Sequence, residues 1–223
     1  MSMMTISVSG SPMHRLSVSR ALASAAAAWI VVVPLLAGAT TPGYSHIASY
    51  ISELGALGMP FGRLVSFGGF LPAGLLTVAF LVAVAPLVPT AGVGRVGYWL
   101  LLGIGTSYIG AALARCDPGC PATGSSRQTV HNLLGLLEYG GGGIGLWFLA
   151  RPPVGGPQGG WVRAGLRGAG AVAIVALVLM GVPELAQHRG LAQRVAEAAL
   201  FSSLLLIGWR VAALEPTGPR SGG

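Results

Sequence analysis

The chain has 223 residues, of which 53% are hydrophobic and only 9% are charged, and its mean hydropathy is strongly positive. This composition excludes a soluble domain with a polar surface, because such domains carry about 25% charged residues. The formal charge of +7 comes from thirteen scattered arginines and no lysine, so the basic clusters of nucleic-acid-binding proteins are missing. The composition therefore predicts an integral membrane protein whose arginines contact lipid headgroups, with no nucleic-acid partner and with its protein partners open.

Apolar runs of the length that crosses a bilayer predict an all-α, polytopic bundle of six transmembrane helices. In chain order these runs cover residues 21–40, 65–88, 94–114, 129–150, 166–187 and 192–213. Breaks containing proline and glycine separate them. We expect a single membrane domain over residues 15–213, with disordered tails at residues 1–14 and 214–223.

The first run, residues 21–40, allows two interpretations. It follows Arg15 and Arg20 and ends in small residues, as a signal peptide does, but its length favours a retained helix. With the N-terminus inside, eight arginines lie on the inner side and five on the outer side. This excess predicts that both termini are cytoplasmic. Arginine as the only strong base, with abundant glycine and alanine, is typical of GC-rich bacterial genomes, so we expect a bacterial inner (cell) membrane.

The stretch YSHIASYISELGA, between the first two runs, holds both a histidine and a glutamate. On a helical wheel its polar side chains fall in one arc, which contains Ser45, His46, Ser49, Ser52 and Glu53. The pattern predicts a short amphipathic helix over about residues 45–57 at the outer interface, with its polar face toward the bundle or toward water. Alternatively, these serines only tolerate contact with water.

The fourth run carries His131 and Glu138 on one helical face. A carboxylate at this depth marks a functional site or a tightly paired group, so pairing with an arginine is the alternative. Four glycines follow at residues 140–143. They predict either close packing of a neighbouring helix or local unwinding, and we expect close packing.

Glu184 and His188 lie four residues apart at the end of the fifth run. On an α-helix this spacing lets two side chains share a metal ion, although it is also common between surface residues. Cys116 and Cys120 enclose the turn sequence Asp117-Pro118-Gly119, and outside the cell such a pair favours a disulfide. A redox-active pair and a metal–thiolate site are the alternatives.

Several strings of this chain resemble one family of bacterial and archaeal membrane proteins. They are YISELGA with the later Pro60-Phe61 pair, FGGFLPAGLL, CDPGCP and VHNLLG. On these motifs the chain resembles the family called domain of unknown function 998, over residues 25–210. The matching positions are Ser52, Glu53, Leu54, Gly55, Ala56, Pro60, Asp117, Pro118 and His131. The resemblance implies six helical spans and a retained first run, but no established reaction.

Five of the six acids and three of the four histidines fall in the outer half of this topology. We therefore expect a polar pocket there, in a metal-assisted or acid–base enzyme acting on a lipid-like substrate. The candidate catalytic residues are Glu53, Asp117, His131 and Glu138. The candidate ligands for zinc or another divalent metal are His46, His131, Glu184 and His188. Ser49, Ser52 and Asn132 are expected to bind the substrate.

Two other functions fit the same residues. The pocket could accept a proton, an ion or an amphiphile in a transport protein, with Glu138 at its centre. In a non-catalytic accessory subunit, by contrast, the outer acids would only neutralise the outer arginines. Pairing with arginines accounts for the acids but not for three histidines on the same side, which favours a pocket.

Overall fold

The computed structural model describes residues 12–157 and 159–211. Over these residues the chain forms helices and no strands, which confirms the all-α class. Residues 12–14, predicted to belong to a tail, already form the start of the first helix. The rest of that predicted tail and the whole of the predicted tail at residues 214–223 lie outside the described residues.

The helical segments line up into six rods. The first is α1 (Pro12–Thr40). The second joins α2 (Gly62–Leu64), η2 (Val65–Phe70), α3 (Leu71–Val84) and η3 (Ala85–Leu87), and the third joins α4 (Val93–Leu100) and α5 (Leu102–Leu113). The fourth joins α6 (Ser126–Gly135), η4 (Leu136–Gly141) and α7 (Gly142–Leu149). The fifth is α8 (Gly160–Met180), and the sixth joins η5 (Pro183–His188), α9 (Arg189–Leu206) and η6 (Ile207–Val211).

Five of these rods are long and apolar enough to cross a membrane. The fourth rod, residues 126–149, is as long as the others but less apolar, because it carries His131, Asn132, Glu138 and several glycines. The protein is therefore an integral membrane protein with at least five candidate spans in its described part.

The fifth rod corrects the predicted boundaries of 166–187. It begins at Gly160 and ends at Met180, because Val182 is extended and Pro183 cannot continue the helix. At its beginning, Arg163 donates to the carbonyl of Val154 at 2.9 Å. This arginine side chain reaches back to the connecting loop. The helix can therefore begin several residues before the apolar run does.

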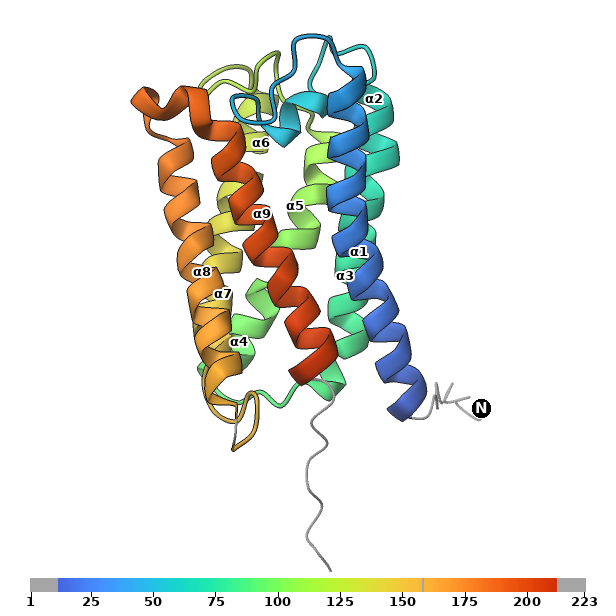
Figure 1. Cartoon of the computed structure of the whole chain (residues 1–223), viewed down its shortest axis with the longest axis vertical. Coiled ribbons are helices and arrows are strands. Elements are labelled where there is room, and N and C mark those ends of the chain that lie inside the picture. The colour runs from blue at the N-terminus through green and yellow to red at the C-terminus, as the bar shows by residue number, and fades with distance from the viewer. Residues whose placement is uncertain (1–11, 158, 212–223) are drawn as a thin grey trace, which may run out of the picture.

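The rods pack in a closed ring that follows the chain order (Figure 1). α1 contacts α3, α3 contacts α5, α4 contacts α7, α7 contacts α8, α8 contacts α9, and α9 returns to α1. The start of α1 and the end of α9 lie at one end of this ring. We call the residues that cover the opposite end, 41–61 and 114–125, the cap.

The two segments of the cap are joined by hydrogen bonds. Arg115 donates from Nε to the carbonyl of Gly55 and from Nη2 to the carbonyl of Ala56, both at 2.7 Å. The amide of Leu57 donates to the carbonyl of Cys116 at 2.9 Å. Arg115 thus holds the two segments together instead of pairing with an outer acid.

The amphipathic helix predicted over residues 45–57 does not form. The chain makes turns at residues 46–48 and then a five-residue 3-10 helix, η1 (Ile51–Gly55). The hydroxyl of Ser45 accepts from the amides of Ile47 and Ala48, and Glu53 accepts from the amide of Tyr50. These side-chain oxygens accept from backbone amides in place of carbonyl oxygens. Such local bonds compete with the α-helix and stabilise turns.

The glycine run after Glu138 packs closely against neighbouring helices, as expected. A Cβ on Gly143 would lie 2.7 Å from Ile174 and 2.9 Å from the carbonyl of Gly170, and one on Gly145 would lie 2.9 Å from the carbonyl of Gly97. The fourth rod remains helical through this run, whose first two glycines end the π-helical segment η4 and whose last two begin α7. Close packing therefore accounts for Gly142 and Gly143 of this run and for Gly145, whereas Gly140 and Gly141 have no comparably close neighbour from another helix.

Candidate functional site

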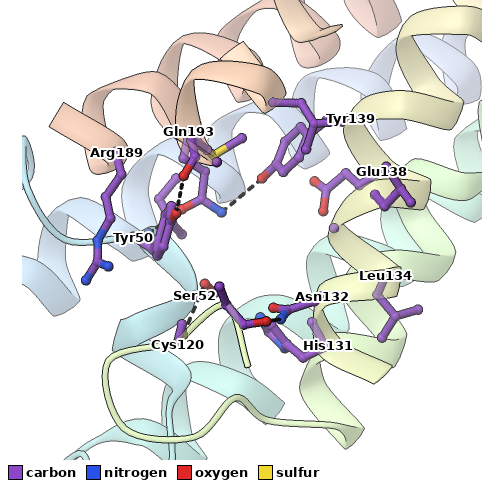
Figure 2. A pocket seen from close by; sticks show the side chains of 18 of the residues that line it. Tyr50, Ser52, Cys120, His131, Asn132, Leu134, Glu138, Tyr139, Arg189 and Gln193 are labelled. Carbon is purple, nitrogen blue, oxygen red and sulfur yellow. Dashed lines mark hydrogen bonds between the residues drawn. The ribbon is translucent and has the colours of Figure 1, made fainter. Parts of the chain in front are cut away.

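A cavity of about 490 Å³ lies inside the ring next to the cap (Figure 2). The cap, α5, the fourth rod, the end of α8, η5 and α9 all contribute to its wall. Most of the wall is apolar. Five of its residues are exposed and mark its outer rim, namely Ala122, Leu136, Gly181, Pro183 and Ala186. A largely apolar cavity with a few convergent polar groups is the usual form of a small-molecule site.

Two buried carboxyl groups form part of the cavity wall. Glu138 is 7% exposed and Glu197 is 5% exposed, and the two interact electrostatically with each other. Each has one buried carboxyl oxygen without a hydrogen-bond partner among the described residues. Neither lies within salt-bridge distance of an arginine there. Such an arrangement is costly in a protein interior and marks a candidate site for a ligand or a proton.

A hydrogen-bond chain connects this carboxyl pair to the cap. Tyr139 donates its hydroxyl to Glu197 Oε1 at 2.7 Å, and Gln193 donates from Nε2 to the Tyr139 oxygen at 2.9 Å. Gln193 in turn accepts from the amide of Ile51 at 2.6 Å. Figure 2 shows this chain running from η4 through α9 to the cap.

The π-helical segment η4 explains why Glu138 and Tyr139 both reach this interior. Adjacent residues of an α-helix point about 100° apart, whereas the wider turn of a π-helix brings them closer in direction. Both residues are buried, and both line the cavity.

The cavity wall also contains four other predicted site residues, Ser52, Cys120, His131 and Asn132. Ser52 donates to Cys120 Sγ at 3.4 Å (Figure 2). His131 binds the carbonyl of Ala114 through Nδ1 at 2.9 Å, and Asn132 donates to the carbonyl of Ala122 at 2.9 Å. With Nδ1 as the donor, His131 keeps a lone pair on Nε2.

Glu53 lies beside the cavity and forms an ion pair and a backbone hydrogen bond. Its Oε1 accepts from Arg189 Nη2 at 3.0 Å and from the amide of Tyr50 at 2.9 Å. The guanidinium of Arg189 lies 4.7 Å from the centre of the Tyr50 ring. Of the five acids that the structure describes, Glu53 alone forms an ion pair. Its contacts attach the cap to α9.

Asp117 lies on the outer surface and does not line the cavity. Its carboxylate accepts from the amide and from the hydroxyl of Ser125, both at 2.9 Å. The backbone bond, then the hydroxyl bond, lowers the pKa of Asp117 below its ordinary value. Ser125 also accepts from the amide of Gln128, so Asp117 holds the N-cap residue that precedes α6.

The structure does not bring together the predicted metal ligands His46, His131, Glu184 and His188. His46 lies in the cap, where it accepts from Arg194 Nη2 at 3.0 Å, and its partial burial, then the charge of Arg194, lowers its pKa. Glu184 and His188 are exposed on η5, which is a 3-10 helix. At three residues per turn, two residues four apart point about 120° apart and do not share a face.

Ser49, predicted to bind substrate, also lies away from the cavity. Its carbonyl accepts from Arg194 Nη1 at 3.2 Å. A different metal-competent cluster is present in the described residues: ligand atoms of Cys116, Cys120 and His131 all lie within 4.8 Å of one another. The two cysteines form the predicted disulfide, with Cα atoms 5.1 Å apart.

Comparison with known proteins identifies the family. The model of the family described as "Protein of unknown function (DUF998)" matches residues 24–210. The chain belongs to this family. No curated protein and no solved structure matches this DUF998 protein.

The sequence of this DUF998 protein did not predict several polar residues of the cavity wall, among them Tyr108, Tyr139, Gln193 and Glu197. One signal was available, because Gln193 and Glu197 lie four apart and therefore share a face of one helix. No pattern in the sequence showed that this face of α9 would meet Glu138 of the fourth rod.

Proposed function

We propose that this DUF998 protein binds an amphiphile with a cationic head, such as an amine, and holds that head at Glu138 and Glu197. The observation that carries the proposal is the pair of buried carboxyl groups without an arginine partner, at the polar end of a mostly apolar cavity. Apolar chains of the ligand would fill the rest of the cavity.

A cationic head fits the carboxyl pair because of charge and hydrogen bonding. Two carboxyl groups that interact at close range do not both ionise easily, so the pair favours a state that shares one proton. An ammonium group supplies three N–H donors and a positive charge, which satisfies the unpartnered oxygens of both residues. An anionic head would be repelled by the same pair.

The first prediction tests this binding with dodecylamine, using dodecyl sulfate as the anionic probe of equal chain length. The full-length protein in lipid nanodiscs is expected to show a concentration-dependent rise in thermal stability with the amine only. Glu138→Gln should weaken amine binding at least tenfold, since it removes one of the two carboxyl groups that would accept from the ammonium.

Glu184→Gln is the matched control for the amine experiment, because Glu184 is exposed on η5 and outside the cavity wall. This control should bind dodecylamine as the wild type does. Equal stabilisation by amine and sulfate, or equal loss in both variants, would mean that the probe binds the lipid or the general surface and would contradict the proposal.

A second candidate function is acid–base chemistry on the bound amphiphile. The observation favouring it is that His131 lines the same cavity as Glu138 and keeps a lone pair on Nε2 when Nδ1 donates to Ala114. A histidine and a carboxyl group in one cavity are the usual pair for proton transfer. Release of a chemically changed amphiphile by the wild type, lost in His131→Gln, would distinguish this function from binding alone.

We also propose that the fourth rod is a sixth span and that both termini are cytoplasmic, in a bacterial cell membrane. Residues 126–149 form an uninterrupted helical rod of about 36 Å at 1.5 Å per residue, enough to cross the hydrocarbon core. Their polar residues His131, Asn132 and Glu138 line the cavity, so they need not face lipid. The cap then lies on the extracytoplasmic side.

A further inference from the structure

We infer that Cys116, Cys120 and His131 form a zinc site when the disulfide is reduced, and that this site opens to the cavity. The disulfide and the zinc site would be two states of the same residues. This inference is independent of the amphiphile proposed above.

The first support is the placement of the donor atoms. One ligand atom from each of the three residues lies within 4.8 Å of the other two, and all three residues are in the cap or beside it. A tetrahedral zinc site with two sulfur ligands places the sulfur atoms about 3.8 Å apart. Because the Cα atoms are 5.1 Å apart, rotation of the cysteine side chains can open the sulfurs to that distance without moving the backbone.

The second support is the hydrogen bond from His131 to the carbonyl of Ala114 at 2.9 Å. A zinc-binding histidine commonly donates its other ring N–H to a backbone carbonyl, which fixes the tautomer and the ring orientation. His131 already has this partner. Ser52 adds a further polar contact, since its hydroxyl donates to Cys120 Sγ at 3.4 Å.

The third support is the open side of the cluster. Cys120 and His131 line the cavity, so three protein ligands would leave the fourth zinc position toward it. Sites with three protein ligands and one open position are those in which zinc binds water or a ligand directly. The cavity, at about 490 Å³, has room for a water molecule or a small ligand at this position.

The conversion balances with a dithiol as reductant. The dithiol gives two electrons and two protons, the bond between the sulfurs of Cys116 and Cys120 breaks, and the reductant becomes a disulfide. Zn²⁺ then replaces the two thiol protons, which are released to solvent, and the neutral imidazole of His131 supplies the third ligand. The reverse exchange uses a disulfide as oxidant: it accepts two electrons from the thiolates and two protons from solvent, becomes a dithiol, and the metal is released.

The test uses the full-length protein in detergent, treated with a phosphine reductant and desalted, beside the untreated disulfide form. Each is mixed with zinc chloride, desalted again and analysed for zinc. The reduced form is expected to retain about one zinc per chain and the disulfide form none. Cobalt chloride added to the reduced wild type should give a thiolate-to-cobalt charge-transfer band, which needs no variant.

The matched variants are His131→Ala and His188→Ala. His131→Ala should lower zinc affinity at least tenfold, whereas His188→Ala, on the exposed η5, should bind zinc as the wild type does. Equal zinc in the reduced and disulfide forms, absence of the cobalt band, or equal affinity in both variants would overturn the inference. Because the dodecylamine experiment uses the disulfide form without metal, the two proposals can fail separately.

Discussion

Gln193 is the residue that connects the carboxyl pair to the cap. It is 8% exposed, accepts from the amide of Ile51 and donates to the hydroxyl of Tyr139. A buried polar group that loses its only hydrogen-bond partner destabilises the protein by about 1–3 kcal/mol, and Gln193 bonds both the Ile51 amide and the Tyr139 hydroxyl. Its contribution to stability should therefore exceed that of any glutamine on the surface.

Replacement of Gln193 with alanine is predicted to lower the free energy of unfolding by about 1–3 kcal/mol, since the Ile51 amide loses its partner and the Tyr139 hydroxyl keeps only its bond to Glu197. Gln187→Ala, at an exposed position of η5, is the control and should change it by less than about 0.5 kcal/mol. Unfolding of the purified proteins in mixed micelles, followed by circular dichroism, measures both. A similar loss in the two variants would show that the Gln193 bonds contribute little.

Individual site residues could be predicted from the sequence only in part. His131 and Glu138 share a helical face in an apolar run, which is visible in one chain, and both line the cavity. Glu53 and Asp117 are equally noticeable as acids in apolar surroundings, but their partners, Arg189 and Ser125, depend on how distant segments meet. Charge alone therefore cannot distinguish a residue that holds the cap from one that faces a ligand.

At the scale of elements, glycine positions decide how closely the rods approach. A Cβ on Gly97 would lie 2.5 Å from the amide nitrogen of Leu149 and 2.6 Å from the carbonyl oxygen of Gly145, so backbone atoms leave it no room. At Gly168, in α8, a Cβ meets nothing within 4 Å. The same residue type thus has opposite roles in two helices.

Gly97→Ala is predicted to separate α4 from α7 and to lower stability by about 1–3 kcal/mol, because the neighbouring backbone cannot move aside locally. Gly168→Ala should leave stability unchanged or raise it by up to about 1 kcal/mol, since alanine is the better helix former. Thermal unfolding of both variants in the same detergent provides the comparison. An equal effect of the two substitutions would be inconsistent with close packing at Gly97.

The rods themselves were largely predictable, because long apolar runs reveal membrane helices. Their ends were not, as α8 shows by beginning six residues before the predicted start at residue 166. Hydropathy identifies the apolar part of a helix. It does not identify the polar first turns, such as those of α8, in which an arginine side chain contacts the connecting loop. The segment at residues 45–57 was predicted wrongly because a helical wheel shows only which side chains share a face. It does not show that a serine hydroxyl can accept from nearby backbone amides and so stabilise turns.

For the whole molecule, the central question is whether residues 126–149 cross the membrane. If they do, Thr123 and Pro157 lie on opposite sides, and both are exposed. We predict that Thr123→Cys, placed in a Cys116→Ser, Cys120→Ser background, reacts with an impermeant maleimide in intact cells. Pro157→Cys in the same background should react only after the membrane is opened.

Labelling of both cysteines from one side would contradict a sixth span. Labelling of Pro157→Cys alone in intact cells would instead reverse the predicted orientation while keeping the span. A third cysteine, Ser45→Cys in the cap, should behave as Thr123→Cys does and serves as the internal control.

The closed ring has a consequence for biogenesis. Gln193, Glu197 and Arg189 all belong to the last rod, α9, which completes the ring against α1. During synthesis, Glu138 enters the membrane before Glu197 exists, and Glu53 is made long before Arg189. Until the final helix inserts, Glu138 and Glu53 therefore lack these partners, and a nascent chain stopped before residue 189 would lack Arg189, Gln193 and Glu197 of the cavity wall.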